Sequence, residues 1–88
     1  MKAKTIEVTF RKGRPFAAYL RLEGTRGNRV RTREVTPSLL VDLDDRGTAL
    51  GIEILAFDDS IIAQINEVLV SLGHTPLSPT ELAPLHAA

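Results

Sequence analysis

The sequence predicts an α+β domain: an antiparallel β-meander of four to five strands with one amphipathic helix packed on one face. Apolar and polar residues alternate in short runs between residues 5 and 55, which is typical of strands that bury one face. The connections between these runs are short, and short connections favour antiparallel pairing over parallel crossovers. One later stretch, residues 59–72, has helical spacing instead.

The first three strands are predicted over residues 5–10, 16–23 and 29–35. Gly13 and Pro15 interrupt the first alternating run, and glycine and proline are the strongest breaks in such a pattern. A polar turn over residues 24–28 is expected to close a hairpin between the second and third strands. The third strand has few apolar residues, so we expect it to lie at an edge of the sheet, where charged side chains discourage pairing with another chain.

Residues 39–55 form the clearest hairpin signal, because two apolar runs flank a polar loop that contains Gly47. The inward-facing side chains of the strands and helix are predicted to be apolar. This set is Ile6, Val8, Phe10, Phe16, Leu20, Leu22, Val41, Leu43, Leu50, Ile52, Ile54, Ile61, Ile62, Ile65, Val68, Leu69 and Leu72.

The helix is expected to end near Leu72, because Gly73 suits the position after a helix C-terminus. Residues 1–75 are thus predicted to be a single domain, followed by a proline-rich tail over residues 76–88. Residues 78–81 carry a capping serine, a proline and a glutamate, which favours one or two short helical turns that Pro84 would end. A flexible tail fits the composition equally well.

Composition narrows the class of protein. Eighty-eight residues suit one domain, and a chain this small often gains further burial by oligomerising. The chain has no cysteine and no apolar run long enough for a bilayer, so we expect a cytoplasmic protein without disulfides or thiolate metal sites. No motif indicates a cofactor.

The charges are unevenly divided. Residues 1–35 hold ten Lys/Arg and three acids (10 − 3 = +7), whereas residues 36–88 hold one Arg and eight acids (1 − 8 = −7). Arg29, Arg31 and Arg33 alternate along the third strand and form a candidate contact for nucleic acid or an acidic partner. The other interpretation, which the opposite half-charges favour, pairs these arginines with Asp42 and Glu53 across one sheet face.

Asp42, Asp44, Asp45 and Glu53 lie close together in the sequence and are candidates for a cation or acid–base site. Asp44 and Asp45 are ordinary turn residues, however, and the loop lacks the ligand number of a calcium site. No serine or histidine has a catalytic partner nearby in the pattern. We therefore predict no catalytic, cofactor or metal site.

Three apolar or aromatic side chains predicted to face away from the helix favour self-association of the chain over a catalytic or metal-binding role. Tyr19, Leu40 and Leu55 fall on the face predicted to be polar. One helix of about fifteen residues is roughly 22 Å long and about 10 Å wide, so it covers only part of a five-stranded sheet. A second copy of the chain, most simply in a dimer, is the expected cover for the remaining apolar area.

The strand motifs resemble those of small bacterial proteins grouped as domain of unknown function 2283. The matching residues are Tyr19, Thr32-Arg33-Glu34-Val35, Val41-Asp42-Leu43-Asp44, Gly47 and Gly51-Ile52-Glu53-Ile54-Leu55. The chain departs from the family's pattern at residues 10–14, where Phe-Arg-Lys-Gly-Arg replaces an acidic segment. The resemblance implies a β-meander with a helix, no established activity, and an antitoxin-like role beside a toxin partner.

Three functional hypotheses follow. The first is a non-enzymatic protein-interaction domain that forms a homodimer or binds a partner such as a toxin. The second is a nucleic-acid-binding regulator that uses Arg29, Arg31 and Arg33. The third is an unrecognised small enzyme or metal site.

Overall fold

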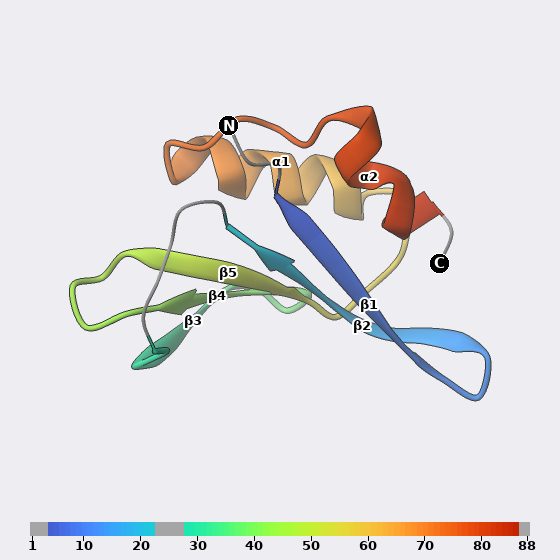
Figure 1. Cartoon of the computed structure of the whole chain (residues 1–88), viewed down its shortest axis with the longest axis horizontal. Coiled ribbons are helices and arrows are strands. Elements are labelled where there is room, and N and C mark those ends of the chain that lie inside the picture. The colour runs from blue at the N-terminus through green and yellow to red at the C-terminus, as the bar shows by residue number, and fades with distance from the viewer. Residues whose placement is uncertain (1–3, 23–27, 87–88) are drawn as a thin grey trace.

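The computed structural model describes residues 4–22 and 28–86. Five antiparallel strands form one sheet, and two helices follow them (Figure 1). The elements are β1 (Thr5–Arg11), β2 (Arg14–Arg21), β3 (Arg31–Thr36), β4 (Leu39–Leu43), β5 (Ala49–Ile54), α1 (Ile61–Ser71) and α2 (Pro79–His86). The predicted α+β class and antiparallel sheet are confirmed, although two helices stand where one was expected.

The strand order is β1-β2-β5-β4-β3, which differs from a simple meander. The predicted hairpin between the second and third strands is wrong, because β2 pairs with β5 and β3 pairs with β4. Most of the turn expected there, residues 23–27, lies outside the described residues. The order places β5 in the centre, where Ile52 is fully buried, and leaves the arginine-rich β3 at an edge as predicted.

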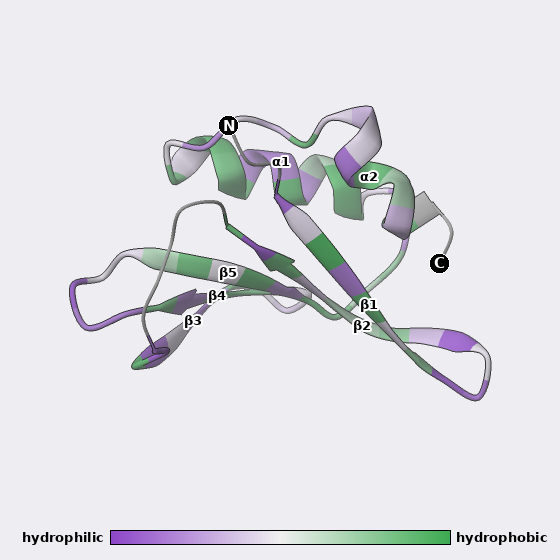
Figure 2. Ribbon diagram, in the orientation of Figure 1, coloured by the Kyte–Doolittle hydropathy of each residue, from purple (hydrophilic) through white to green (hydrophobic). Residues whose placement is uncertain are grey.

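Both helices lie over the same face of the sheet (Figure 1). Hydrophobic segments of the strands and of α1, shown in green in Figure 2, contribute the side chains of one core cluster. Leu20, Leu39, Ile65 and Leu69 have no exposed surface in this core. Burying one such side chain contributes about 1.5–3 kcal/mol, so this layer is the main source of stability.

Two residues predicted to face the core are instead exposed. Phe10 and Phe16 are 53% and 52% accessible. They lie near the end of the β1–β2 hairpin, which extends beyond the helices (Figure 1). Alternation placed them correctly in strands, but no helix covers this end of the hairpin.

The α1 helix begins two residues later than predicted. The carboxylate of Asp58 accepts hydrogen bonds from the backbone N–H and the hydroxyl of Ser60, at 3.0 and 2.7 Å, and orders the entry to the helix. Gly73 has the positive φ (+83°) expected after the C-terminus, and the N–H of His74 donates to the carbonyl of Leu69 at 2.8 Å. The C-terminal prediction is confirmed.

The α2 helix has eight residues, which agrees with the longer of the one or two helical turns expected and not with a flexible tail. Ser78 and Glu81 form a reciprocal capping box, in which the Ser78 N–H donates to the Glu81 carboxylate and the Glu81 N–H donates to the Ser78 hydroxyl. Pro84 does not end the helix, which continues to His86. A proline there removes one backbone hydrogen bond, and the helix tolerates this loss while it packs against β1.

The segment before α2 is also tied to the rest of the domain. Leu77 is buried, and its N–H donates to the side chain of Asn66 on α1 at 2.9 Å. The N–H of Lys4 donates to Glu81 at 2.7 Å, which joins the start of the sheet to α2. Within residues 4–22 and 28–86, no helix has the length and apolar character needed to cross a membrane.

Candidate functional site

The candidate site lies on the open face, which we define as the face of the sheet opposite α1 and α2. Paired residues in adjacent antiparallel strands share a face, so the register identifies its members. Two rows cross all five strands: Thr5–Arg21–Gly51–Asp42–Thr32 and Glu7–Tyr19–Glu53–Leu40–Glu34. The open face therefore carries charges of both signs around a few apolar side chains.

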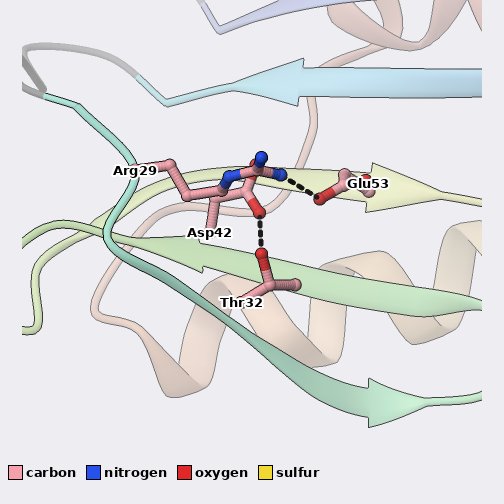
Figure 3. Close-up of polar contacts among 4 residues, drawn as sticks. All are labelled: Arg29, Thr32, Asp42 and Glu53. Atoms are coloured by element: carbon pink, nitrogen blue, oxygen red, sulfur yellow. Dashed lines mark hydrogen bonds and ion pairs between the residues drawn. The ribbon is translucent and has the colours of Figure 1, made fainter.

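Asp42 is the central polar residue of this face and is only 5% exposed. Apolar alternation in β4 turns Val41 toward the helices and leaves Asp42 on the open side. The hydroxyl of Thr32, its partner on β3, donates to the Asp42 carboxylate at 2.8 Å (Figure 3). A buried carboxylate needs such donors, because an unpaired buried charge is strongly unfavourable.

Tyr19 leans from β2 across Gly51 toward Asp42. A Cβ atom at position 51 would overlap the hydroxyl and ring of Tyr19. Because glycine has no Cβ, the Tyr19 ring can lie over this position. The pKa of Tyr19 is raised to about 12, mainly by burial and further by the charge and hydrogen bond of Asp42, while Arg21 acts in the opposite direction. The neutral phenol is thus the form that this site favours.

Glu53 completes the cluster. A hydrogen bond with Asp42, burial and the charge of Asp42 raise the pKa of Glu53, whereas Arg29 acts in the opposite direction. The Arg29 guanidinium lies 3.8 Å from the Glu53 carboxylate (Figure 3) but is 61% exposed, so this ion pair is weak. The neighbouring carboxylate therefore outweighs the arginine, and Glu53 holds its proton more firmly than a free glutamate.

The structure separates the three arginines that were predicted to act together. Arg29 precedes β3 and reaches Glu53 on the open face, as one interpretation expected. Arg31 and Arg33 pair with Leu43 and Val41, so they point to the helix side at the β3 edge. Asp42 is bonded to Thr32, although the sequence suggested an arginine partner.

The three residues predicted for self-association do share one surface. Tyr19, Leu40 and Leu55 all lie on the open face, and Leu55 is 47% exposed. Beside Tyr19 is a hollow of about 290 Å³, lined by Glu7, Thr9, Ala17, Tyr19, Glu53 and Leu55. The open face is therefore shaped by these side chains and is not uniformly flat.

The remaining acids of the hairpin serve the turn. The Asp44 carboxylate accepts hydrogen bonds from the N–H groups of Arg46 and Thr48, at 2.8 and 2.9 Å. Among the described residues, no group of three or more His, Cys, Asp or Glu side chains is arranged to hold a metal ion. Asp44 belongs to the hairpin turn, away from the row that holds Asp42.

Sequence reasoning missed the link between Tyr19, Gly51, Asp42 and Thr32. Two signals could have revealed it. An aspartate inside the apolar run LLVDL requires a partner if it is buried, and a glycine inside a strand often marks the close approach of another group. The register then brings these positions into neighbouring pairs on one face.

Comparison with known proteins confirms the family resemblance. Residues 17–57 match the family model described as a protein of unknown function (DUF2283). The matched segment contains Tyr19, Thr32, Asp42, Gly51 and Glu53, which are the residues that meet on the open face. No curated protein and no solved structure matches the chain.

Tyr19 offers a direct test of the cluster, because it is the chain's single tyrosine and tryptophan is absent. We expect ultraviolet titration of the phenol to show a midpoint near the pKa of about 12. Asp42→Asn should lower the midpoint toward the ordinary value of about 10 without reaching it, because burial remains. The raised pKa of Tyr19 also adds to the free energy of unfolding. This contribution should be full below about pH 10 and should fall as the pH rises through the folded-state pKa of Tyr19.

Asp45→Asn is the matched control, since Asp45 is an exposed turn residue and its loss should leave the Tyr19 midpoint unchanged. Circular dichroism at each pH would show that the chain stays folded during the titration. A wild-type midpoint near 10 in folded protein would contradict the arrangement.

Proposed function

We propose that this chain is a non-enzymatic protein-interaction domain that forms a homodimer through the open face of its sheet. The single observation that carries the proposal is that both helices cover one face, while no described element covers the other, which bears the exposed side chain of Leu55 beside Tyr19. Exposed apolar groups surrounded by polar ones are typical of interaction surfaces.

The charges of the open face suit a second copy of the same chain. Arg21 lies in one row and forms an ion pair, at 3.7 Å, with Glu7 of the next row in the same chain, and Glu34 lies in that second row as well. In a two-fold dimer each row can meet the other, so Arg21 of one copy can face Glu34 of its partner. A surface with both signs is self-complementary in a way that a purely basic or acidic face is not.

The area of the open face is small for a protein–protein interface. Five strands of about six residues measure roughly 20 Å on each side, which offers about 400–500 Å² per copy. The total is close to the lower limit of about 1,000 Å² for a specific interface. Interfaces near this limit are typical of weak encounters, so we expect a concentration-dependent dimer.

The expected setting is the bacterial cytoplasm, supported by the family resemblance and by the absence of cysteine. A toxin-type protein, the other partner suggested by that resemblance, would use the same open face. It would then compete with the second copy, and the experiment below distinguishes the two.

Leu55→Asp tests the proposal. A charge in place of this apolar side chain should weaken dimerisation at least tenfold, because it would lose hydration at the interface without gaining a partner. Sedimentation equilibrium over about 1–500 μM would measure the dissociation constant. Val70→Asp is the matched control, since Val70 is 59% exposed on α1 and lies away from the open face.

A wild-type chain that remains monomeric at the highest concentration would rule out the homodimer and leave the toxin-type partner. Equal weakening by both aspartate variants would place the interface elsewhere.

A further inference from the structure

The end of the β1–β2 hairpin carries positive charge without compensation. Residues 8–16 contain Arg11, Lys12 and Arg14 and no acid. Within the part of the chain that the structure describes, none of the three forms an ion pair. The hairpin extends away from the helices, and its tip is strongly hydrophilic (Figures 1 and 2).

The local structure of this tip is unfavourable in two ways. Arg11 and Arg14 are direct cross-strand partners, and like charges in such a pair repel. Lys12 has φ of +52°, the only positive value at a non-glycine position among the described residues, in a turn that asparagine, aspartate or glycine usually forms. Backbone strain at an exposed site is a reason to look for a function there.

Aromatic surface accompanies the charge. Phe16 and Phe10 are each about half exposed, and the Arg11 guanidinium carbon lies 4.2 Å from the centre of the Phe16 ring. A hollow of about 510 Å³ is lined by Arg11, Lys12, Arg14, Pro15 and Phe16. The hollow thus combines cations with a flat apolar ring.

From these observations we infer that the hairpin tip, residues 10–16, binds single-stranded nucleic acid. The three cations would contact phosphates, and a base would stack against the exposed ring of Phe16, as in other binders of single strands. This site is separate from the open face and does not depend on the proposed dimer. It also lies at the opposite edge of the sheet from Arg31 and Arg33, because β1 and β3 are the two edge strands.

The position of the charges favours nucleic acid over a membrane surface. Insertion into a bilayer would place aromatic rings farthest from the domain, with cations behind them. Here the order is reversed, since Lys12 and Gly13 form the turn while Phe10 and Phe16 lie farther back along the strands. The cations at the turn suit contact with a chain of phosphates.

Fluorescence anisotropy with a labelled twelve-nucleotide oligouridine would test this site. For single strands, the logarithm of the binding constant falls with the logarithm of the salt concentration by about 0.7 for each phosphate contacted. Contact with three phosphates should therefore reduce affinity about twentyfold between 50 and 200 mM salt. Phe16→Leu should weaken binding about fivefold or more, because it keeps an apolar side chain but loses stacking, whereas Phe16→Tyr should bind like the wild type.

The decisive comparison uses two variants with the same change of net charge. Arg11→Gln with Arg14→Gln should weaken binding at least tenfold, and Arg31→Gln with Arg33→Gln less than threefold. Equal losses would show attraction to the molecule as a whole and would overturn the site. Absence of binding at 20 mM salt would also overturn it, as would capture by phosphatidylserine vesicles without any binding to the oligonucleotide.

Discussion

Gly51→Ala is expected to lower the free energy of unfolding by about 1–3 kcal/mol, the usual range for overpacking. The added carbon would occupy the space of the Tyr19 ring, which must move away from Asp42. The sign should reverse when Tyr19 is also alanine. Without the ring, alanine in place of glycine at a strand interior should stabilise the chain by about 0.5–1 kcal/mol.

Urea unfolding of the wild type, both single variants and the double variant would measure this coupling. In Gly51→Ala the phenol midpoint of Tyr19 should also fall toward 10, because the ring leaves its buried place. Similar destabilisation by Gly51→Ala with and without Tyr19 would show that the glycine has another role.

Leu39→Ala is expected to cost about 2–5 kcal/mol, while Leu40→Ala should cost less than about 1 kcal/mol in the monomer. Leu39 has no exposed surface and faces the helices, whereas Leu40 is half-buried on the open face beside Glu53. The two substitutions remove the same atoms from adjacent positions. The difference between their losses of unfolding free energy therefore shows which face of the sheet forms the core.

Chemical unfolding below about 1 μM would keep the chain monomeric for this comparison. At higher concentration, Leu40→Ala should gain an added cost if the open face forms the dimer. Equal losses for the two leucines at low concentration would contradict the assigned faces.

Local patterns predicted the strands and the first helix well, because side-chain alternation and helical spacing follow from backbone geometry. They could not determine the strand order. Whether β2 pairs with β3 or with β5 depends on which arrangement buries Leu20 beside Ile52, and that contact spans thirty-two positions in the chain. Phe10 shows the same limit. Alternation placed it in a strand, but the register shifts between Thr9 and Phe10, and its cover depends on how far the helices extend.

The candidate site was foreseen only in part. Tyr19, Leu40 and Leu55 were correctly placed on one face, because strand periodicity alone determines this. The hydrogen bonds around Asp42 depend on four strands, β2, β5, β4 and β3, meeting in one register. The basic hairpin tip was visible in the sequence, but its distance from Arg31 and Arg33 depends on the strand order.

The two edges of the sheet have a consequence for how copies of this protein can assemble. The β1 edge is tied to α2 through Lys4 and Glu81, and the β3 edge presents Arg31 and Arg33. Charged or attached edges resist the addition of further strands, so a growing fibril has no ready end to extend. The proposed dimer would use the open face once per copy, which would limit assembly to a closed pair.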